Sequence, residues 1–218
     1  MFRASRDYEK ARQAMVARQL RGRGIKDGRV LDAMGRVPRE RFLPEGRQTQ
    51  AYDDSALGIG LGQTISQPYM VALMTEALHL RPDDRVLEVG TGSGYQAAML
   101  AELSAHVCTV ERLAELSERA RALLCDELGY TNISFKVGDG TLGWPEKSPF
   151  DRIMVTAGAP HRPQILLDQL APRGEAVAPV GGQHWQTLTH YRRKPDDTIE
   201  EHKVCECVFV RLIGEDGW

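Results

Sequence analysis

The sequence predicts an α/β fold with a doubly wound, mostly parallel sheet. Two observations predict it. From Pro68 onward, short apolar runs alternate with helix-like segments, which is typical of right-handed βαβ crossovers. A glycine-rich turn, GTGSG, follows the first apolar run, at the point where such sheets bind ligands.

The first 67 residues are expected to form a helical cap that ends in a loop, not an independent domain. Residues 7–24 have apolar side chains near helical spacing, and Asp27 is placed to cap a second helix in DGRVLDAM. Residues 51–62, AYDDSALGIGLG, are rich in glycine and are expected to be a loop. The cap therefore spans residues 1–67.

Residues 68–182 are expected to form the α/β core. Proline at the first position of PYMVALMTEALHL suits a helix start, because that position needs no N–H donor. The expected strands are RVLEVG, HVCTVER, ISFKVGDG, FDRIMVTAG and EAVAPVG; the helices between them are SGYQAAMLAELS, LAELSERARALLCDELG and PQILLDQLAPRG, the last closed by Gly174. In residues 183–218, the extended runs QTLTHYRR and TIEEHKVCECVFVRLIG flank a KPDD turn, which predicts an antiparallel edge hairpin.

Composition excludes several classes of partner. The formal net charge is −2 with both signs interspersed, so no nucleic-acid partner is expected, and acids flank the basic run ARQLRGRGIKDGR. No apolar run approaches the ~18 residues that a membrane span needs, and the N-terminus lacks the apolar region of a signal peptide. We expect a cytoplasmic monomer with no membrane partner.

The cysteines indicate reduced thiols. Cys205 and Cys207 are two apart, on one face of a strand, where a disulfide does not form easily. Cysteine and histidine pairs with zinc-site spacing are missing from the sequence, so no metal site is predicted.

The stretch LEVGTGSGYQAAML predicts a ligand-binding turn. Gly90, Gly92 and Gly94 allow the chain to turn tightly from strand to helix and a ligand to approach the backbone. Such glycines also occur in βα turns without a ligand. Glu111 and Asp139 end the next two strands, where carboxylates can accept bonds from ribose hydroxyls and an adenine amine. Each acid alone fits a helix cap, but together they favour a nucleoside.

The spacing G-x-G-x-G and Glu88, two residues before the first glycine, indicate which nucleoside. A nicotinamide site prefers G-x-G-x-x-G and places pyrophosphate on the helix N-terminus. Glu88 would repel a pyrophosphate but suits a cation. S-adenosylmethionine has a sulfonium and an α-ammonium and no phosphate, and it is the cofactor that we predict.

These residues resemble the protein-L-isoaspartate (D-aspartate) O-methyltransferase family over almost the whole chain. The matching pieces are AYDDSALGIGLGQTISQPYMVALM, RVLEVGTGSGYQAAML, VER, VGDGTLGWPEKSPFDRIMVTAGAP and LLDQLAPRGEAVAPVG. The resemblance implies a Rossmann-like methyltransferase fold and methyl transfer from S-adenosylmethionine, giving S-adenosylhomocysteine. The acceptor would be the free carboxylate of L-isoaspartyl residues in damaged proteins, with D-aspartyl residues as a second candidate acceptor. The methyl ester would then collapse to a succinimide.

The resemblance also implies site residues in this sequence. Ser66 would be the catalytic residue and, with Ile65, would bind substrate at the end of the N-terminal cap, the substrate loop. The cofactor would be bound by Gln63, Thr64, Glu88, Gly90, Gly92, Gly94, Glu111, Arg112, Gly138, Asp139 and Gly140.

Chemistry favours an orienting role for Ser66. A carboxylate nucleophile is already ionised at neutral pH, so alignment and exclusion of water are needed and a general base is not. Neutral donors at a helix entrance suit such an anion. The alternative role for Ser66 is a helix cap.

Three residues depart from the family pattern: Gly158 replaces alanine, Arg173 replaces glycine and Arg211 replaces proline. The change at Arg211 puts the peptide contacts of the C-terminal segment in question. Two other functions fit the sequence: a methyltransferase acting on another small substrate, and a non-catalytic sensor that binds the cofactor or a damaged peptide.

Overall fold

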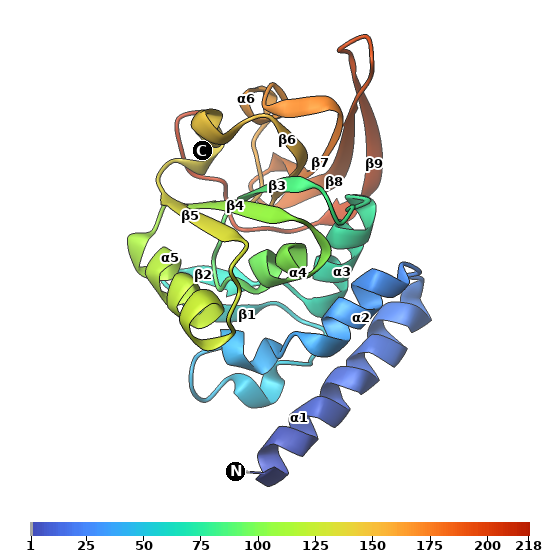
Figure 1. Cartoon of the computed structure of the whole chain (residues 1–218), viewed down its shortest axis with the longest axis vertical. Helices are drawn as coiled ribbons and strands as arrows, with labels where there is room; N and C mark the ends of the chain where they lie inside the picture. The colour runs from blue at the N-terminus through green and yellow to red at the C-terminus, as the bar shows by residue number, and fades with distance from the viewer. Residues whose placement is uncertain (1) are drawn as a thin grey trace.

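The computed structural model describes residues 2–218, with side chains from Asp7 onward. A seven-stranded sheet forms its centre, in the order β5-β4-β3-β6-β7-β8-β9 (Figure 1). The first five of these strands are parallel, and β8 and β9 are antiparallel additions at one edge. The bounds are Arg85–Val89 for β3, His106–Glu111 for β4, Ile133–Val137 for β5, Phe150–Val155 for β6, Leu170–Gly182 for β7, Trp185–Arg193 for β8 and Ile199–Cys207 for β9. The predicted doubly wound sheet with an edge hairpin is confirmed.

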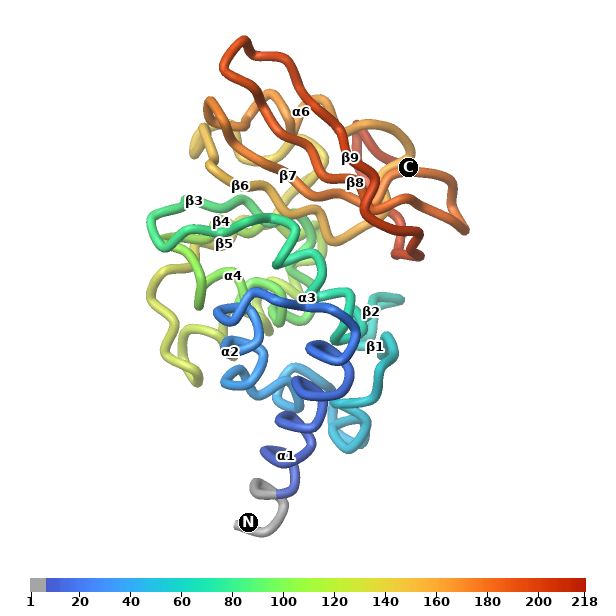
Figure 2. The backbone as a smooth tube through the Cα atoms, turned by 90° about the vertical axis from the view of Figure 1, so that its right-hand side faces the viewer, coloured from blue at the N-terminus to red at the C-terminus, as the bar shows by residue number. Residues whose placement is uncertain are grey.

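Both faces of the sheet are covered, which explains the continuous apolar runs of its strands. On β3, Val86 belongs to one buried cluster and Leu87 and Val89 to another, because successive side chains point to opposite faces. Figure 2 shows α2, α3 and α4 on one side of the sheet, and the first cluster combines buried residues of these helices with residues of the strands. The main helices are α2 (Gly28–Arg36), α3 (Pro68–Ala77), α4 (Tyr95–Leu103) and α5 (Ala114–Arg121).

The N-terminal helices follow the sequence prediction. Helix α1 (Phe2–Ala14) continues through a π-helical turn, Met15–Leu20, and a 3₁₀ turn, Arg21–Arg23. Asp27 Oδ1 accepts a hydrogen bond from the backbone N–H of Arg29 (2.9 Å), which is the predicted cap of α2. Within residues 2–218, no helix has the length and apolarity that crossing a membrane requires.

The structure corrects the prediction of a loop in residues 51–62. Strands β1 (Leu57–Gly60) and β2 (Gln63–Ile65) pair as an antiparallel hairpin. Three consecutive residues with positive φ, Gly60, Leu61 and Gly62, form its turn. The glycines that predicted a loop in the sequence therefore form the tight turn of a hairpin.

Two further boundaries differ from the prediction. Helix α6 is one turn long (Gln164–Leu167), and β7 begins at Leu170, which pairs with Phe150, so Gly174 lies inside the strand. A register shift between Phe150 and Arg152 absorbs the extra residues. Strand β9 ends at Cys207, and the chain then turns back toward the parallel strands instead of extending the hairpin.

Candidate active site

A cleft opens at the carboxyl ends of β3, β4 and β6, the edge that the sequence predicts for ligand binding. It encloses about 820 Å³, its open mouth included. The end of β2, the first turns of α3, the glycine turn, the end of β4 and the C-terminal segment line it. The lining includes these predicted site residues: Gln63, Thr64, Ile65, Ser66, Gly90, Gly92, Glu111, Arg112 and Gly140. Glu88, Gly94, Gly138 and Asp139 lie outside this lining.

The turn after β3 requires glycine. Gly90, Gly92 and Gly94 have φ of +96°, +54° and +85°, a region that favours glycine. A Cβ on Gly90 would lie 2.4 Å from Thr156 Oγ1, and the Thr156 hydroxyl donates a hydrogen bond to the Gly90 carbonyl oxygen (2.6 Å). A Cβ on Gly94 would lie 2.9 Å from Leu124 Cδ1. Gly90 and Gly92 thus line the cleft with backbone that carries no side chain. Gly94 lets the start of α4 pack closely against the segment that follows α5.

Glu111 fixes this turn from the neighbouring strand. One carboxylate oxygen accepts from the N–H of Gly92 (2.9 Å) and the other from the N–H of Leu113 (3.0 Å). Its side chain is largely buried but lines the cleft. The carboxylate is held in one orientation and keeps lone pairs for a ligand hydroxyl.

Glu88 lies behind the cleft and faces the helices. It accepts a hydrogen bond from the Thr109 hydroxyl (2.5 Å), and Thr109 Oγ1 lies 2.6 Å from the hydroxyl oxygen of Thr91, which lines the cleft. Burial raises the pKa of Glu88 to about 8. The structure therefore connects Glu88 to the cleft through two threonine hydroxyls rather than by direct exposure.

Asp139 lies beside the cleft under the C-terminal segment. Its carboxylate accepts from the N–H (2.8 Å) and hydroxyl (2.6 Å) of Thr141 and from the N–H of Glu215 (2.7 Å). Burial opposes ionisation, but these hydrogen bonds hold the pKa of Asp139 below its ordinary value. The adjacent Gly140 reaches the cleft, and a Cβ there would lie 2.7 Å from Val89 Cγ1.

Ser66 connects the β1–β2 hairpin to α3. The N-cap of α3 is Gln67, without a side-chain cap bond, so the alternative role of Ser66 as the helix cap is wrong. Ser66 is one of the residues that line the cleft, and its carbonyl oxygen accepts a hydrogen bond from Arg39 Nη2 (2.7 Å). The backbone of Ser66 is thus held at the cleft by a side chain that does not line the cleft.

That anchor, Arg39, was missed by the sequence analysis. Arg39 has no exposed surface, and its Nε donates to the carbonyl oxygen of Ala51 (2.7 Å). Its guanidinium lies 4.9 Å from the ring centroid of Tyr95. Burial lowers the pKa of Arg39. An arginine between Pro38 and Phe42 gives no local signal of burial, because its partners lie 12 and 27 residues away.

The C-terminal segment forms another wall of the cleft that the sequence analysis largely missed. Its lining residues are Phe209, Val210, Arg211, Leu212 and Ile213. The N–H of Gly158 donates to the Val210 carbonyl oxygen (2.7 Å), and the N–H of Leu212 donates to the Gly158 carbonyl oxygen (2.9 Å). A Cβ on Gly158 would lie 3.0 Å from Gln186 Cδ, which is a tight contact. Glycine at this departure from the family pattern therefore leaves room for the Gln186 side chain.

Almost the whole chain matches one protein family. The family model for protein-L-isoaspartate(D-aspartate) O-methyltransferase matches residues 10–217. The chain belongs to this family. Among its relatives, the protein-L-isoaspartate O-methyltransferase of Syntrophus aciditrophicus is 51% identical over 213 residues, 97% of each chain. Protein-L-isoaspartate O-methyltransferase 2 of Geotalea uraniireducens is 54% identical over 208 residues, 95% of each chain. The resemblance found in the motifs is confirmed.

Solved structures of this methyltransferase family agree. A protein-L-isoaspartate O-methyltransferase superposes with a TM-score of 0.84 at 30% identity, over 94% of this chain and 67% of the other. A Plasmodium falciparum protein assigned the same activity, in complex with S-adenosyl-L-homocysteine, superposes with a TM-score of 0.78 at 27% identity, over 93% of this chain and 98% of the other. The predicted methyltransferase fold is confirmed.

Proposed function

We propose that this protein is a repair methyltransferase that methylates the free carboxylate of L-isoaspartyl residues in damaged proteins. S-adenosylmethionine supplies the methyl group. The observation that carries the proposal is one cleft in which the glycine turn and Glu111 face the QTIS segment. The residues proposed to bind the nucleoside and those proposed to bind the substrate carboxylate therefore line the same cleft.

The donor set of the cleft fits S-adenosylmethionine. Gly90 and Gly92 line the cleft with backbone that carries no side chain, and Glu111 offers fixed carboxylate oxygens for ribose hydroxyls. Thr91 links the turn to the buried carboxyl of Glu88, which offers a polar neighbour for the cationic part of the molecule. Asp139 and Gly140 would adjoin the adenine, with Gly94, Gly138 and Arg112 shaping the adjacent backbone.

The substrate side needs alignment and has the groups for it. An isoaspartyl carboxylate has a pKa near 4 when unperturbed and is ionised at neutral pH, so its deprotonation requires no base. The Ser66 hydroxyl would donate to this carboxylate or to the adjacent amide, next to Gln63, Thr64 and Ile65. Arg211, which also lines the cleft, adds a positive charge on the substrate side.

The decisive experiment is methyl transfer to two peptides that differ at one residue, L-isoaspartyl or L-aspartyl. We expect base-labile label from S-adenosylmethionine on the isoaspartyl peptide alone. Label on neither peptide, with cofactor binding demonstrated by calorimetry, would favour the other methyltransferase or the sensor. Absence of cofactor binding would remove the basis of the proposal.

Ser66→Ala tests the orienting role. We expect kcat to fall by a factor on the order of 100, because the carboxylate loses its alignment, while the Kd for S-adenosylmethionine changes less than threefold. Gln183→Ala, on the exposed β7–β8 turn, is the control and should leave both values unchanged. An unchanged kcat in Ser66→Ala would contradict the assignment.

Other parts of the sequence interpretation stay predictions. They are a single domain divided at residues 67 and 182, a monomeric state, a cytoplasmic location, activity on D-aspartyl residues, and no nucleic-acid or membrane partner.

A further inference from the structure

Three side chains that offer metal-ligating atoms converge near the amino ends of the parallel strands, at the end of the sheet opposite the cleft. His79 Nδ1 and His190 Nε2 lie 2.8 and 2.9 Å from Glu175 Oε2, and the three atoms lie within 4.8 Å of one another. Glu175 pairs with Arg152 near the start of β6, whereas the cleft lies beyond the end of that strand. The cluster and the cleft therefore lie at opposite ends of the parallel strands.

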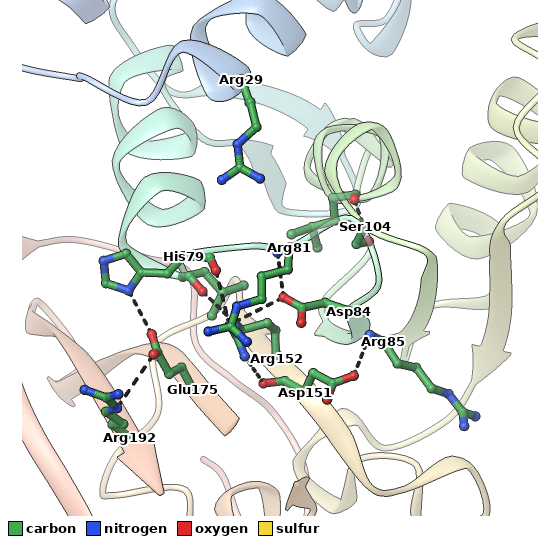
Figure 3. Close-up of polar contacts among 12 residues, drawn as sticks. Arg29, His79, Arg81, Asp84, Arg85, Ser104, Asp151, Arg152, Glu175 and Arg192 are labelled. Carbon is green, nitrogen blue, oxygen red and sulfur yellow. Dashed lines mark hydrogen bonds and ion pairs between the residues drawn. The ribbon is translucent and has the colours of Figure 1, made fainter. Parts of the chain in front are cut away.

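The backbone around His79 is fixed by hydrogen bonds from a buried arginine. Arg152 donates from Nε to the Leu78 carbonyl oxygen (2.8 Å) and from Nη2 to the His79 carbonyl oxygen (3.2 Å). Arg152 in turn pairs with Asp84 at 3.3 Å, and both side chains are almost fully buried (Figure 3). His79 itself has a φ of +48°. The backbone after α3 is thus fixed in an uncommon conformation that brings the imidazole over β7.

We propose that His79, Glu175 and His190 form a binding site for a divalent transition metal, zinc above all. Two imidazole nitrogens and one carboxylate oxygen are a donor set that zinc binds at about 2.0–2.2 Å, whereas calcium and magnesium prefer oxygen ligands alone. The His79 side chain is 66% exposed and the other two are 11% exposed. A metal here would be reached from solvent on the His79 side, which leaves room for water as the remaining ligand.

In the metal-free protein these atoms share hydrogen bonds, and their convergence on one carboxylate oxygen gathers the donors that a metal would take up. Both histidines approach the same oxygen, Oε2, and their rings meet edge to face with centroids 5.6 Å apart. Arg192 Nε lies 3.9 Å from the other oxygen, Oε1, on the side away from His79 (Figure 3). Arg192 thus approaches the carboxylate at Oε1, whereas the two histidines converge on Oε2.

A metal at this point would join three parts of the fold. His79 follows α3, Glu175 belongs to β7 and His190 belongs to β8, so one ion would tie the helix layer to the edge hairpin. Because the ion binds the folded state, it should raise the Tm of the protein. Methyl transfer should not depend on it, since the cleft lies at the other end of the strands.

The test is titration of the full-length, chelator-stripped protein with zinc, followed by calorimetry and thermal melting. We expect one zinc per chain, a raised Tm, and a Kd at least tenfold weaker in His79→Gln and in Glu175→Gln. His79 is exposed, so His79→Gln should fold normally. His184→Gln, an exposed histidine of the β7–β8 turn, is the matched control and should bind like the wild type.

Three results would overturn the proposal. Equal zinc affinity in the wild type and both variants would place the metal elsewhere, and so would a thiolate-to-metal absorption band when cobalt(II) replaces zinc. Absence of binding to the wild type at 100-fold excess zinc would show that the three residues do not form a zinc site. Methyl transfer by chelated protein is measured in parallel, so that failure of the metal site and failure of the proposed function are separate outcomes.

Discussion

Glu88 is a buried acid whose protonation affects both the fold and the cleft. Removal from water is the main reason that its pKa rises to about 8, and the carboxylate of Glu111 raises it further, although the hydrogen bond from Thr109 opposes the rise. Below about pH 8 the folded protein therefore keeps Glu88 largely neutral. The negative charge that the sequence argument gave to Glu88 is largely absent in the free protein at neutral pH.

Glu88→Gln should flatten the pH dependence of stability. Between about pH 4.5 and pH 8, the folded wild type holds a proton that the unfolded chain has released, so its free energy of unfolding falls as the pH rises through this window. Each pKa unit is worth about 1.4 kcal/mol, and glutamine removes this contribution. Urea unfolding at pH 5 and pH 8.5 measures it.

The control for Glu88→Gln is Glu118→Gln, which changes an exposed acid of α5. It should keep the wild-type slope of unfolding free energy against pH. If Glu88→Gln kept that slope as well, the raised pKa of Glu88 would be refuted.

At the scale of elements, the β1–β2 hairpin is held at the mouth of the cleft by one side chain. Arg39 joins the carbonyl oxygens of Ala51 and Ser66, one before the hairpin and one after it. Hydrogen bonds from a charged donor are strong, and here one goes to a buried carbonyl and one to a partly buried carbonyl. The position of Ser66 thus depends on a residue that does not line the cleft.

Arg39→Met should separate substrate alignment from cofactor binding. Loss of both hydrogen bonds should lower the free energy of unfolding by about 2–4 kcal/mol. The kcat for the isoaspartyl peptide should fall roughly tenfold, while the Kd for S-adenosylmethionine stays within about threefold of wild type. Peptide kinetics and calorimetry measure the two effects.

Arg41→Met is the control for that variant, because Arg41 forms an exposed ion pair with Glu127. Its effect on stability should stay within about 1 kcal/mol. Equal effects of the two substitutions on kcat would show that Arg39 does not position Ser66.

Local patterns predicted the elements of the parallel core well and the irregular elements poorly. The apolar runs of β3, β4 and β6 are buried on both faces, so their composition indicates strands without further context. The β1–β2 hairpin is short and glycine-rich, so it resembles a loop. Strand β7 begins early because Leu170 pairs with Phe150, a contact between strands that PQILLDQLAPRG does not reveal.

At the scale of the whole molecule, the C-terminal segment closes the cleft by contacts over long sequence distances. The N–H of Glu215 binds Asp139, 76 residues away, and Trp218 Nε1 donates to the carbonyl oxygen of Gly158 (3.0 Å). The predicted carboxylates and glycines share short motifs, whereas this wall and the cluster of His79, Glu175 and His190 come from distant positions. Spacing rules therefore find the motifs and miss the wall and the cluster.

Gly214→Ala should loosen that wall. A Cβ on Gly214 would lie 2.0 Å from Asp139 Oδ1, so the segment must move away from the carboxylate. We expect the free energy of unfolding to fall by about 1–3 kcal/mol and the Kd for S-adenosylmethionine to rise several-fold. Gly28→Ala, where a Cβ would meet no atom within 4 Å, is the control and should weaken neither the fold nor the binding of S-adenosylmethionine. Wild-type affinity in Gly214→Ala would show that the segment does not support the cofactor side.

Strand β9 gives the sheet an open edge, and an open edge can recruit strands from other chains. The residues along this strand include Glu200, Glu201, His202, Lys203 and Glu206, most of them exposed. Charges along a free edge disfavour the addition of another strand, because pairing would bring them out of water. A repair enzyme meets chains that are damaged and partly unfolded, and such chains have free strands of their own. The charged border of β9 would let the enzyme bind them at its cleft without co-aggregating with them.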